Sequence, residues 1–247
     1  MRRRAWLLCG FFGLLALGRA AVPPLLDAAV RKLQADEDHW AYTQTTMAFD
    51  RAGKAKERVT VERYDPSRPV AEQWSLLQWQ GHEPTAGEMR TWKKRKDREQ
   101  KRREEKTLGE IMDLGRAHAV SVSESEVVFE VPLLPGASQR LPADKFVVLM
   151  TVDPARETLQ GFNLKTLEPF RAMGVAKIER IEIEARFHLI DERYAPQPGH
   201  ILAHGTGKLL FFRVGGGAEI TWSDFKRVKP YQERFEVKIG EMKAFGF

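Results

Sequence analysis

Alternation of apolar and polar residues is the dominant pattern of the chain, and it is clearest at residues 181–189. Successive side chains of a β-strand point to opposite faces of a sheet, so this period of two predicts a strand with one buried face. In residues 59–64 the valines alternate with Thr60 and Glu62. Similar patterns predict strands at residues 40–49, 74–79, 120–122, 127–131, 146–152, 159–167, 201–214, 218–228 and 235–239.

Two segments have helical spacing instead of alternation. Residues 25–35 place apolar side chains three and four positions apart, which predicts an amphipathic helix. Thr85 followed by Glu88 is the signature of a capping box and predicts a second helix start. From there we expect a helical insertion over residues 86–114, of which residues 93–106 contain no apolar side chain.

The balance of elements, many strands and few helices, predicts the fold class. We expect an α+β fold with a strongly curved antiparallel β-sheet, a half-barrel, and helices on its concave side or edge. Gly215-Gly216-Gly217 is interpreted as the hairpin turn between residues 201–214 and 218–228. Residues 146–152 are apolar on both faces, so either a helix covers one side or the sheet curls around an apolar cavity.

Residues 1–20 have the parts of a secretory signal peptide. Three arginines, Arg2 to Arg4, precede an apolar stretch at residues 5–17, and small residues lead to Ala20. The apolar stretch is shorter than the ~20 residues needed to span a bilayer. We expect cleavage after Ala20 and export to the periplasm. On this prediction Cys9 is removed with the signal, and we expect residues 21–247 to form a single sheet-rich domain.

The formal net charge of +6 comes from two segments. The predicted signal holds four arginines and no acidic residue, and residues 90–106 hold ten Lys or Arg against four Asp or Glu. The remainder of the predicted mature chain is mildly acidic. The basic character therefore belongs to one helical segment.

Motifs for catalysis, cofactors or metals are absent from the sequence. Of the six histidines, His200 and His204 are four apart, but in a strand they lie two pleats apart and are poorly placed to share a metal. Glu182 and Glu184 point to one face, about 7 Å apart, which suits either a carboxylate pair or a solvated surface. We expect no enzymatic activity, no cofactor and no bound metal.

The basic segment permits several interpretations, the simplest being a solvated helix. A nucleic-acid partner is not expected, because export separates the protein from it and four acidic residues interrupt the charge. Docking to an anionic membrane surface or to an acidic envelope protein is the alternative. That surface would comprise Trp92, Lys93, Lys94, Arg95, Lys96, Arg98, Lys101, Arg102 and Arg103.

The order of these features resembles the bacterial lipoprotein-sorting, or outer-membrane lipoprotein carrier, superfamily. The likeness lies in Tyr42-Thr43-Gln44 on an aromatic strand after an amphipathic helix, in Arg186-Phe187 near the end of a long strand, and in a strand through residues 208–212 followed by a hairpin. This resemblance concerns the order of the elements and covers most of the chain. It implies a curved antiparallel sheet whose helices cover an apolar concave face that holds acyl chains.

An acyl ligand requires a large and mostly hydrophobic concave surface. Candidate lining residues are Phe146, Val148, Met150, Phe162, Phe187, Leu189, Phe211 and Trp222. Packing of helices onto the sheet is the alternative role for each of them. We expect an exported non-enzymatic protein that binds or carries a lipid or acyl ligand. The alternative is an envelope interaction or scaffold protein whose basic helix docks a partner.

Overall fold

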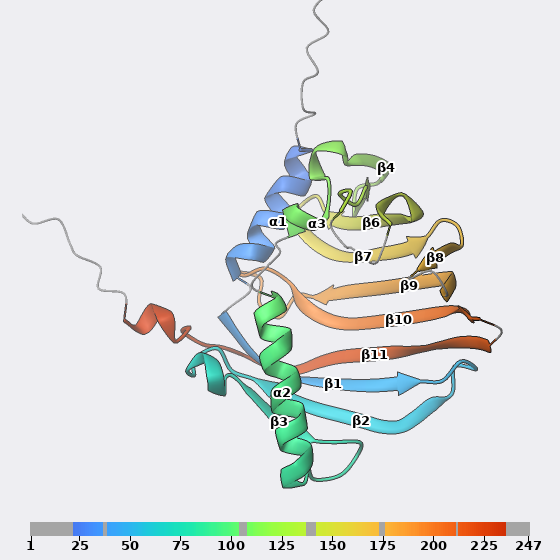
Figure 1. Ribbon diagram of the computed structural model, residues 1–247. Coiled ribbons are helices and arrows are strands. Elements are labelled where there is room, and N and C mark those ends of the chain that lie inside the picture. Colours follow the sequence, from blue (N-terminus) through green and yellow to red (C-terminus); the bar gives the residue numbers. More distant parts are fainter. Residues whose placement is uncertain are drawn as a thin grey trace, which may run out of the picture.

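The computed structural model describes residues 22–36, 39–103, 108–136, 142–172, 176–210 and 212–235 (Figure 1). The predicted signal peptide lies outside the described residues. So does the predicted strand at 235–239, except for Phe235, which lies in a bend.

The described residues form one antiparallel sheet of eleven strands. In chain order these are β1 (Trp40–Phe49), β2 (Ala55–Tyr64), β3 (Trp74–Gln78), β4 (His118–Val122), β5 (Val127–Val131), β6 (Phe146–Asp153), β7 (Thr158–Thr166), β8 (Phe170–Ala172), β9 (Ala176–His188), β10 (Gln197–Leu209) and β11 (Phe212–Arg227). Their order across the sheet is β3-β2-β1-β11-β10-β9-β7-β6-β5-β4, with β8 also paired to β9. Because β3 and β4 are not paired with each other, the sheet is open. The predicted α+β class with a curved antiparallel sheet is confirmed.

Two long helices, α1 (Pro24–Asp36) and α2 (Ala86–Arg103), and the short α3 (Leu108–Ile111) accompany the sheet in the described residues. Single 3₁₀ turns occur at Val70–Glu72, Leu114–Arg116, Ala143–Lys145 and Gln232–Arg234. Within the predicted helical insertion at 86–114, α2 covers 86–103 and α3 covers 108–111, and residues 104–107 lie outside the description. Over the described parts of the chain, no helix is both long and apolar enough to cross a membrane.

The hydrophobic core lies between α1 and the β5-β6-β7 part of the sheet. Leu26, Ala29 and Val30 lie on one face of α1 and are almost completely buried. The sheet contributes the buried residues Val127, Phe129, Val131, Val148, Met150, Val152 and Leu159. Full burial of a side chain of this kind is worth about 1.5–3 kcal/mol, so the face of α1 is a main source of stability.

The carboxyl end of α1 is fixed by a second contact, which is polar. Asp36 is buried, and its Oδ2 accepts a hydrogen bond of 2.8 Å from Trp40 Nε1 and one of 3.4 Å from Gln197 Nε2. Arg227 forms an ion pair with the same carboxylate and lies over the ring of Tyr194. A buried carboxylate needs such partners, because leaving it unpaired costs several kcal/mol.

The triple glycine is not a turn, so that prediction is wrong. Gly215, Gly216 and Gly217 lie inside β11, and β10 ends at Leu209. A Cβ atom on Gly217 would lie 2.4 Å from the carbonyl oxygen of Ala203, and one on Gly216 would lie 2.8 Å from that of Phe49. The glycines are therefore required by the close approach of neighbouring strands.

Candidate functional site

One face of the sheet carries both long helices, and the strand register shows which residues lie on it. Directly paired residues share a face of an antiparallel sheet. Starting from the core residue Met150, the pairs lead across six strands through Phe162, Ala185, Ile201, Ile220 and Thr46. A neighbouring row leads from Val148 through Leu164, Ile183, Ala203, Ala218 and Ala48. The helix-bearing face is therefore apolar well beyond the core.

The helices cover only part of this apolar surface. Among the described helices, α1 packs on β6 and β7, whereas α2 contacts β3 and reaches β2. On the strands between them most apolar residues of this face are half-buried, although Ala185 is buried. We call this surface the central strip: Ile183, Ile201, Ala203, Ala218, Ile220 and Trp222. Figure 1 shows the two helices at one end of the strands, with no helix drawn over the other end of β10 and β11.

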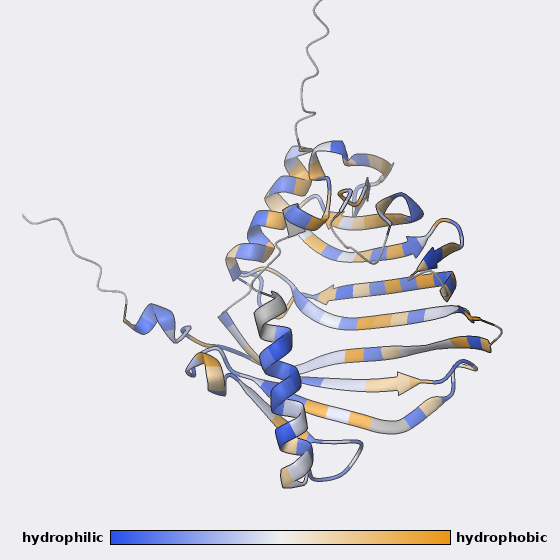
Figure 2. Ribbon diagram, in the orientation of Figure 1, coloured by the Kyte–Doolittle hydropathy of each residue, from blue (hydrophilic) through white to orange (hydrophobic). Residues whose placement is uncertain are grey.

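The opposite face of the same strands is polar. Glu184 pairs with Arg186 at 2.7 Å, and His200 Nε2 lies 2.8 Å from Glu219 Oε1. Figure 2 shows the resulting alternation of hydrophobic and hydrophilic residues along β9. The acidic residues that suggested a cation site are thus paired with basic side chains on a solvated face. Across the described residues, no cluster of three or more potential metal ligands occurs.

The helix α2 borders the central strip and is held by one buried carboxylate. Glu62 of β2 is only 2% exposed. It accepts hydrogen bonds from Trp92 Nε1 and from Gln44 Nε2 at 3.2 Å. Arg95 and Lys96 lie 3.1 and 3.0 Å from its two oxygens. These four donors make Glu62 the anchor between α2 and the sheet.

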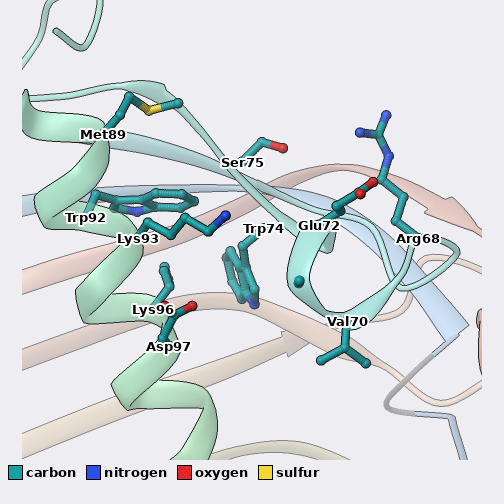
Figure 3. Close-up of a pocket in the computed structure, with 11 residues that line it drawn as sticks. Arg68, Val70, Glu72, Trp74, Ser75, Met89, Trp92, Lys93, Lys96 and Asp97 are labelled. Carbon is teal, nitrogen blue, oxygen red and sulfur yellow. The ribbon is translucent and has the colours of Figure 1, made fainter. Parts of the chain in front are cut away.

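Aromatic rings complete the attachment of α2. Lys96 Nζ lies 3.8 Å from the centre of the Trp74 ring, and Arg95 lies over Trp79 at 5.4 Å. Trp92 is buried beneath the helix, and beside it lies a cavity of about 290 Å³ that is open to solvent. Figure 3 shows Trp74 and Trp92 facing this cavity together with Lys96. Its lining combines the rings of Trp74 and Trp92 and the side chains of Val70 and Met89 with charged groups from both walls, and it includes no residue of the central strip.

The first turn of α2 is fixed by the predicted capping box. Glu88 Oε2 accepts hydrogen bonds from the Thr85 backbone N–H at 2.9 Å and from its hydroxyl at 2.8 Å. The Glu88 backbone N–H donates to Thr85 Oγ1 in return. These bonds, the backbone one first, hold the pKa of Glu88 below its ordinary value. The prediction of a helix start at Thr85 is confirmed.

The predicted apolar lining residues are distributed over three places. Phe146, Val148 and Met150 are buried, and α1 fills the space that a ligand would need over Val148 and Met150. Phe162 and Phe187 are partly buried and pack against that core. Leu189 is exposed beyond the end of β9, and Phe211 lies outside the described residues. Of the eight, Trp222 lies on the central strip.

The predicted basic surface is divided between two directions. Trp92 and Lys96 point to Glu62, and Arg95 is shared between Glu62 and solvent, because a buried carboxylate attracts nearby donors. Lys93, Lys94 and Arg98 remain exposed. The side chains of Lys101, Arg102 and Arg103 lie outside the description.

Sequence reasoning missed the central strip and the anchor. The signal for the strip was present as alternation in residues 181–189, but its exposure depends on where the helices end. Glu62 alternates with Val59 and Val61, a pattern that by itself indicates a buried valine face and a polar face that carries Glu62. In the structure Glu62 and Tyr64 are buried on the helix-bearing face, whereas Val61 lies on the other.

Comparison with solved structures finds similar chains. A LolA superfamily protein from Nitrosomonas europaea aligns over 88% of this chain and 98% of its own, with 10% sequence identity and a TM-score of 0.37. No protein-family model and no curated protein matches the sequence.

Proposed function

We propose that this protein is a non-enzymatic carrier that binds a lipid acyl chain on the central strip. The observation that carries the proposal is the apolar surface itself. It continues from the core beneath α1 across β9, β10 and β11, and it stays half-buried between the two helices. A soluble protein rarely leaves a contiguous apolar surface of this kind without a binding partner.

The dimensions and chemistry of the strip suit an extended apolar ligand. The three adjacent strands β9, β10 and β11 span about 10 Å across the sheet at the usual strand spacing. Each methylene removed from water contributes up to about 0.8 kcal/mol. Trp222 and Gln44 are directly paired at the border with α2, where an aromatic ring and an amide offer contacts to the polar end of a ligand.

Export to the periplasm is part of the proposal and rests on the signal-like residues 1–20. A periplasmic location supplies a lipid-rich envelope on both sides. It also agrees with an acyl ligand better than with a nucleic acid, which the basic segment alone would suggest.

Native mass spectrometry of the protein purified from a bacterial periplasm tests this function. We expect an added mass that corresponds to a phospholipid, a fatty acid or a lipoprotein acyl group, and that disappears after delipidation. A protein that carries no such mass, and that takes up none when mixed with phospholipid micelles, contradicts the proposal.

An envelope interaction protein is the second candidate, and one observation favours it. Lys93, Lys94 and Arg98 are exposed on α2, whose opposite side is fixed to the sheet by Glu62. A rigid helix that presents cations is suited to an acidic partner. Charge removal at these three positions, followed by crosslinking in the periplasm, distinguishes this function from lipid carriage.

A further inference from the structure

The turn between β10 and β11 carries exposed apolar side chains. Leu210 is 64% exposed and Phe212 is 73% exposed, and Leu209 and Val214 beside them are also exposed. We call Leu209, Leu210, Phe212 and Val214 the hairpin tip. Figure 1 places this end of β10 and β11 away from α1 and α2. An exposed apolar cluster of this kind marks an interaction site or a membrane contact.

Tight hairpin turns favour glycine, asparagine and aspartate, whereas Leu210 follows β10 here. Leu209, the last residue of β10, pairs with Phe212, the first residue of β11, so the connection between the two strands is short. Leu210 has a φ of +55°, in the left-handed region that favours glycine or asparagine. A bulky apolar residue at this position is unfavourable for folding. The apolar character of the turn therefore points to a role outside the fold.

Basic residues lie across the strands directly behind the tip. Arg171 of β8 pairs with Lys177 of β9, Lys177 pairs with Lys208 of β10, and Lys208 pairs with Arg213 of β11. We call these four residues the cation row. Like charges directly opposite one another destabilise a sheet, and Glu179, which lies 3.5 Å from Lys208, offsets the repulsion in part. Their mutual repulsion favours an anionic partner at this edge.

The apolar and basic groups lie on different faces of the same hairpin. Phe212 and Val214 share the helix-bearing face with Ala218 and Ile220, because they alternate along β11. Lys208 and Arg213 lie on the opposite face. The hairpin is therefore amphipathic, as are elements that lie at a bilayer interface with apolar side chains inserted and basic ones near the headgroups.

We propose that the hairpin tip and the cation row dock the protein on an anionic lipid bilayer. The tip inserts its apolar side chains among the acyl chains, and the cation row contacts the negatively charged headgroups. Ala218 and Ile220 of the central strip lie on the same face of β11 as Val214 and Phe212 of the tip, so docking would bring the strip close to the membrane surface. The docking inference itself does not depend on acyl binding by the strip.

Vesicle sedimentation tests the docking. We expect the wild-type protein to sediment with vesicles of equal parts phosphatidylglycerol and phosphatidylcholine, and far less with phosphatidylcholine alone. Leu210→Gly should weaken this binding at least tenfold, because an inserted leucine is lost, without lowering the thermal midpoint, because glycine suits the positive φ. Phe212→Ser should weaken binding to a similar degree. Lys177→Gln combined with Arg213→Gln should reduce the preference for the anionic vesicles.

Two controls locate the contact. Replacing Lys93, Lys94 and Arg98 by glutamine should leave vesicle binding unchanged, and so should Ile201→Asn on the central strip. A failure of acyl binding alone therefore leaves the docking result intact. The proposal is overturned if the wild type binds neither vesicle, or if the helix variant loses binding while Leu210→Gly keeps it. A wild-type dimer that Leu210→Gly converts to a monomer, with no vesicle binding, also overturns it.

Discussion

The two long helices lie on the same face of one sheet, and similar polar groups fasten them in place. Asp36 at the end of α1 accepts hydrogen bonds from a tryptophan indole and a glutamine amide and pairs with Arg227. Glu62 beneath α2 does the same with Trp92, Gln44 and two cations. The helices differ in what surrounds the anchor. An apolar face of α1 is buried in the core, whereas in α2 Trp92 is buried and Met89 is exposed.

The two helices therefore have different roles, since α1 stabilises the domain whereas α2 is only attached to it. Apolar burial by α1 stabilises the whole domain, because the same residues form the core of β5, β6 and β7. The helix α2 adds little apolar burial, so its position depends on a few directional contacts to one carboxylate. Loss of α1 packing should unfold the domain, whereas loss of the Glu62 contacts should release α2 and leave the sheet folded.

Leu26→Ala should give the largest effect. Leu26 is completely buried, so truncation leaves a cavity and should lower the free energy of unfolding by about 2–5 kcal/mol. Chemical denaturation monitored by tryptophan fluorescence measures this change. Met89→Ala, at the exposed foot of α2, is the matched control and should cost less than about 1 kcal/mol. Equal losses in the two variants would show that the helices contribute alike.

Glu62→Gln should have a smaller and local effect. The change removes the charge that holds Arg95 and Lys96, and it places an amide N–H₂ where an acceptor is needed. We expect about 2 kcal/mol of local destabilisation. Hydrogen exchange of α2 amides should accelerate while β6 and β7 stay protected.

Glu99→Gln is the control for this change. Glu99 pairs with the same Arg95 and Lys96, but its side chain is exposed, so its loss should cost less than about 0.5 kcal/mol. If Glu62→Gln leaves α2 exchange unchanged, or exposes the β6 and β7 amides equally, the distinction between the helices is contradicted.

The capping box of α2 should give the smallest effect, visible as a pH dependence. The folded pKa of Glu88 lies below its ordinary value of 4.5. Its contribution to helix stability is therefore complete above the unfolded pKa and is lost as pH falls through the folded pKa. The protection factors of the first amides of α2, which correct for the pH dependence of the intrinsic exchange rate, should fall on acidification. In Glu88→Gln this fall should be absent, since glutamine does not titrate, and its persistence there would assign it to another group.

The local alternation of apolar and polar residues was sufficient to predict most strands of the sheet. β1 has the predicted bounds, and β6 has the predicted alternation, with Phe146, Val148, Met150 and Val152 buried on one face. These signals are carried by neighbouring residues in the chain, because the period of two is a local property. Where two strands come unusually close, the reason is nonlocal, and the triple glycine of β11 was therefore misread as a turn.

The candidate site depended on contacts that no local pattern contains. Phe146, Val148 and Met150 are apolar, as the lining of a ligand site would be, but α1 covers that part of the sheet. Ile201 and Ile220 are also apolar, and they lie where the described helices do not reach. Similarly, Glu62 has the sequence context of a solvated residue, and its burial follows from Trp92 and Lys96, some thirty residues later.

The central claim is that the half-buried apolar strip binds an acyl chain, and two adjacent positions of β10 test it most directly. Ile201 lies on the strip, whereas Leu202 lies on the opposite face, between Glu184 and Glu219. Replacing either by asparagine gives a neutral side chain of similar length. Titration with the fluorescent fatty acid cis-parinaric acid should show binding about tenfold weaker for Ile201→Asn, since an unpaired amide under an acyl chain costs about 1–2 kcal/mol. Leu202→Asn should bind like the wild type. Equal affinity in all three proteins, or a loss confined to Leu202→Asn, would contradict the account.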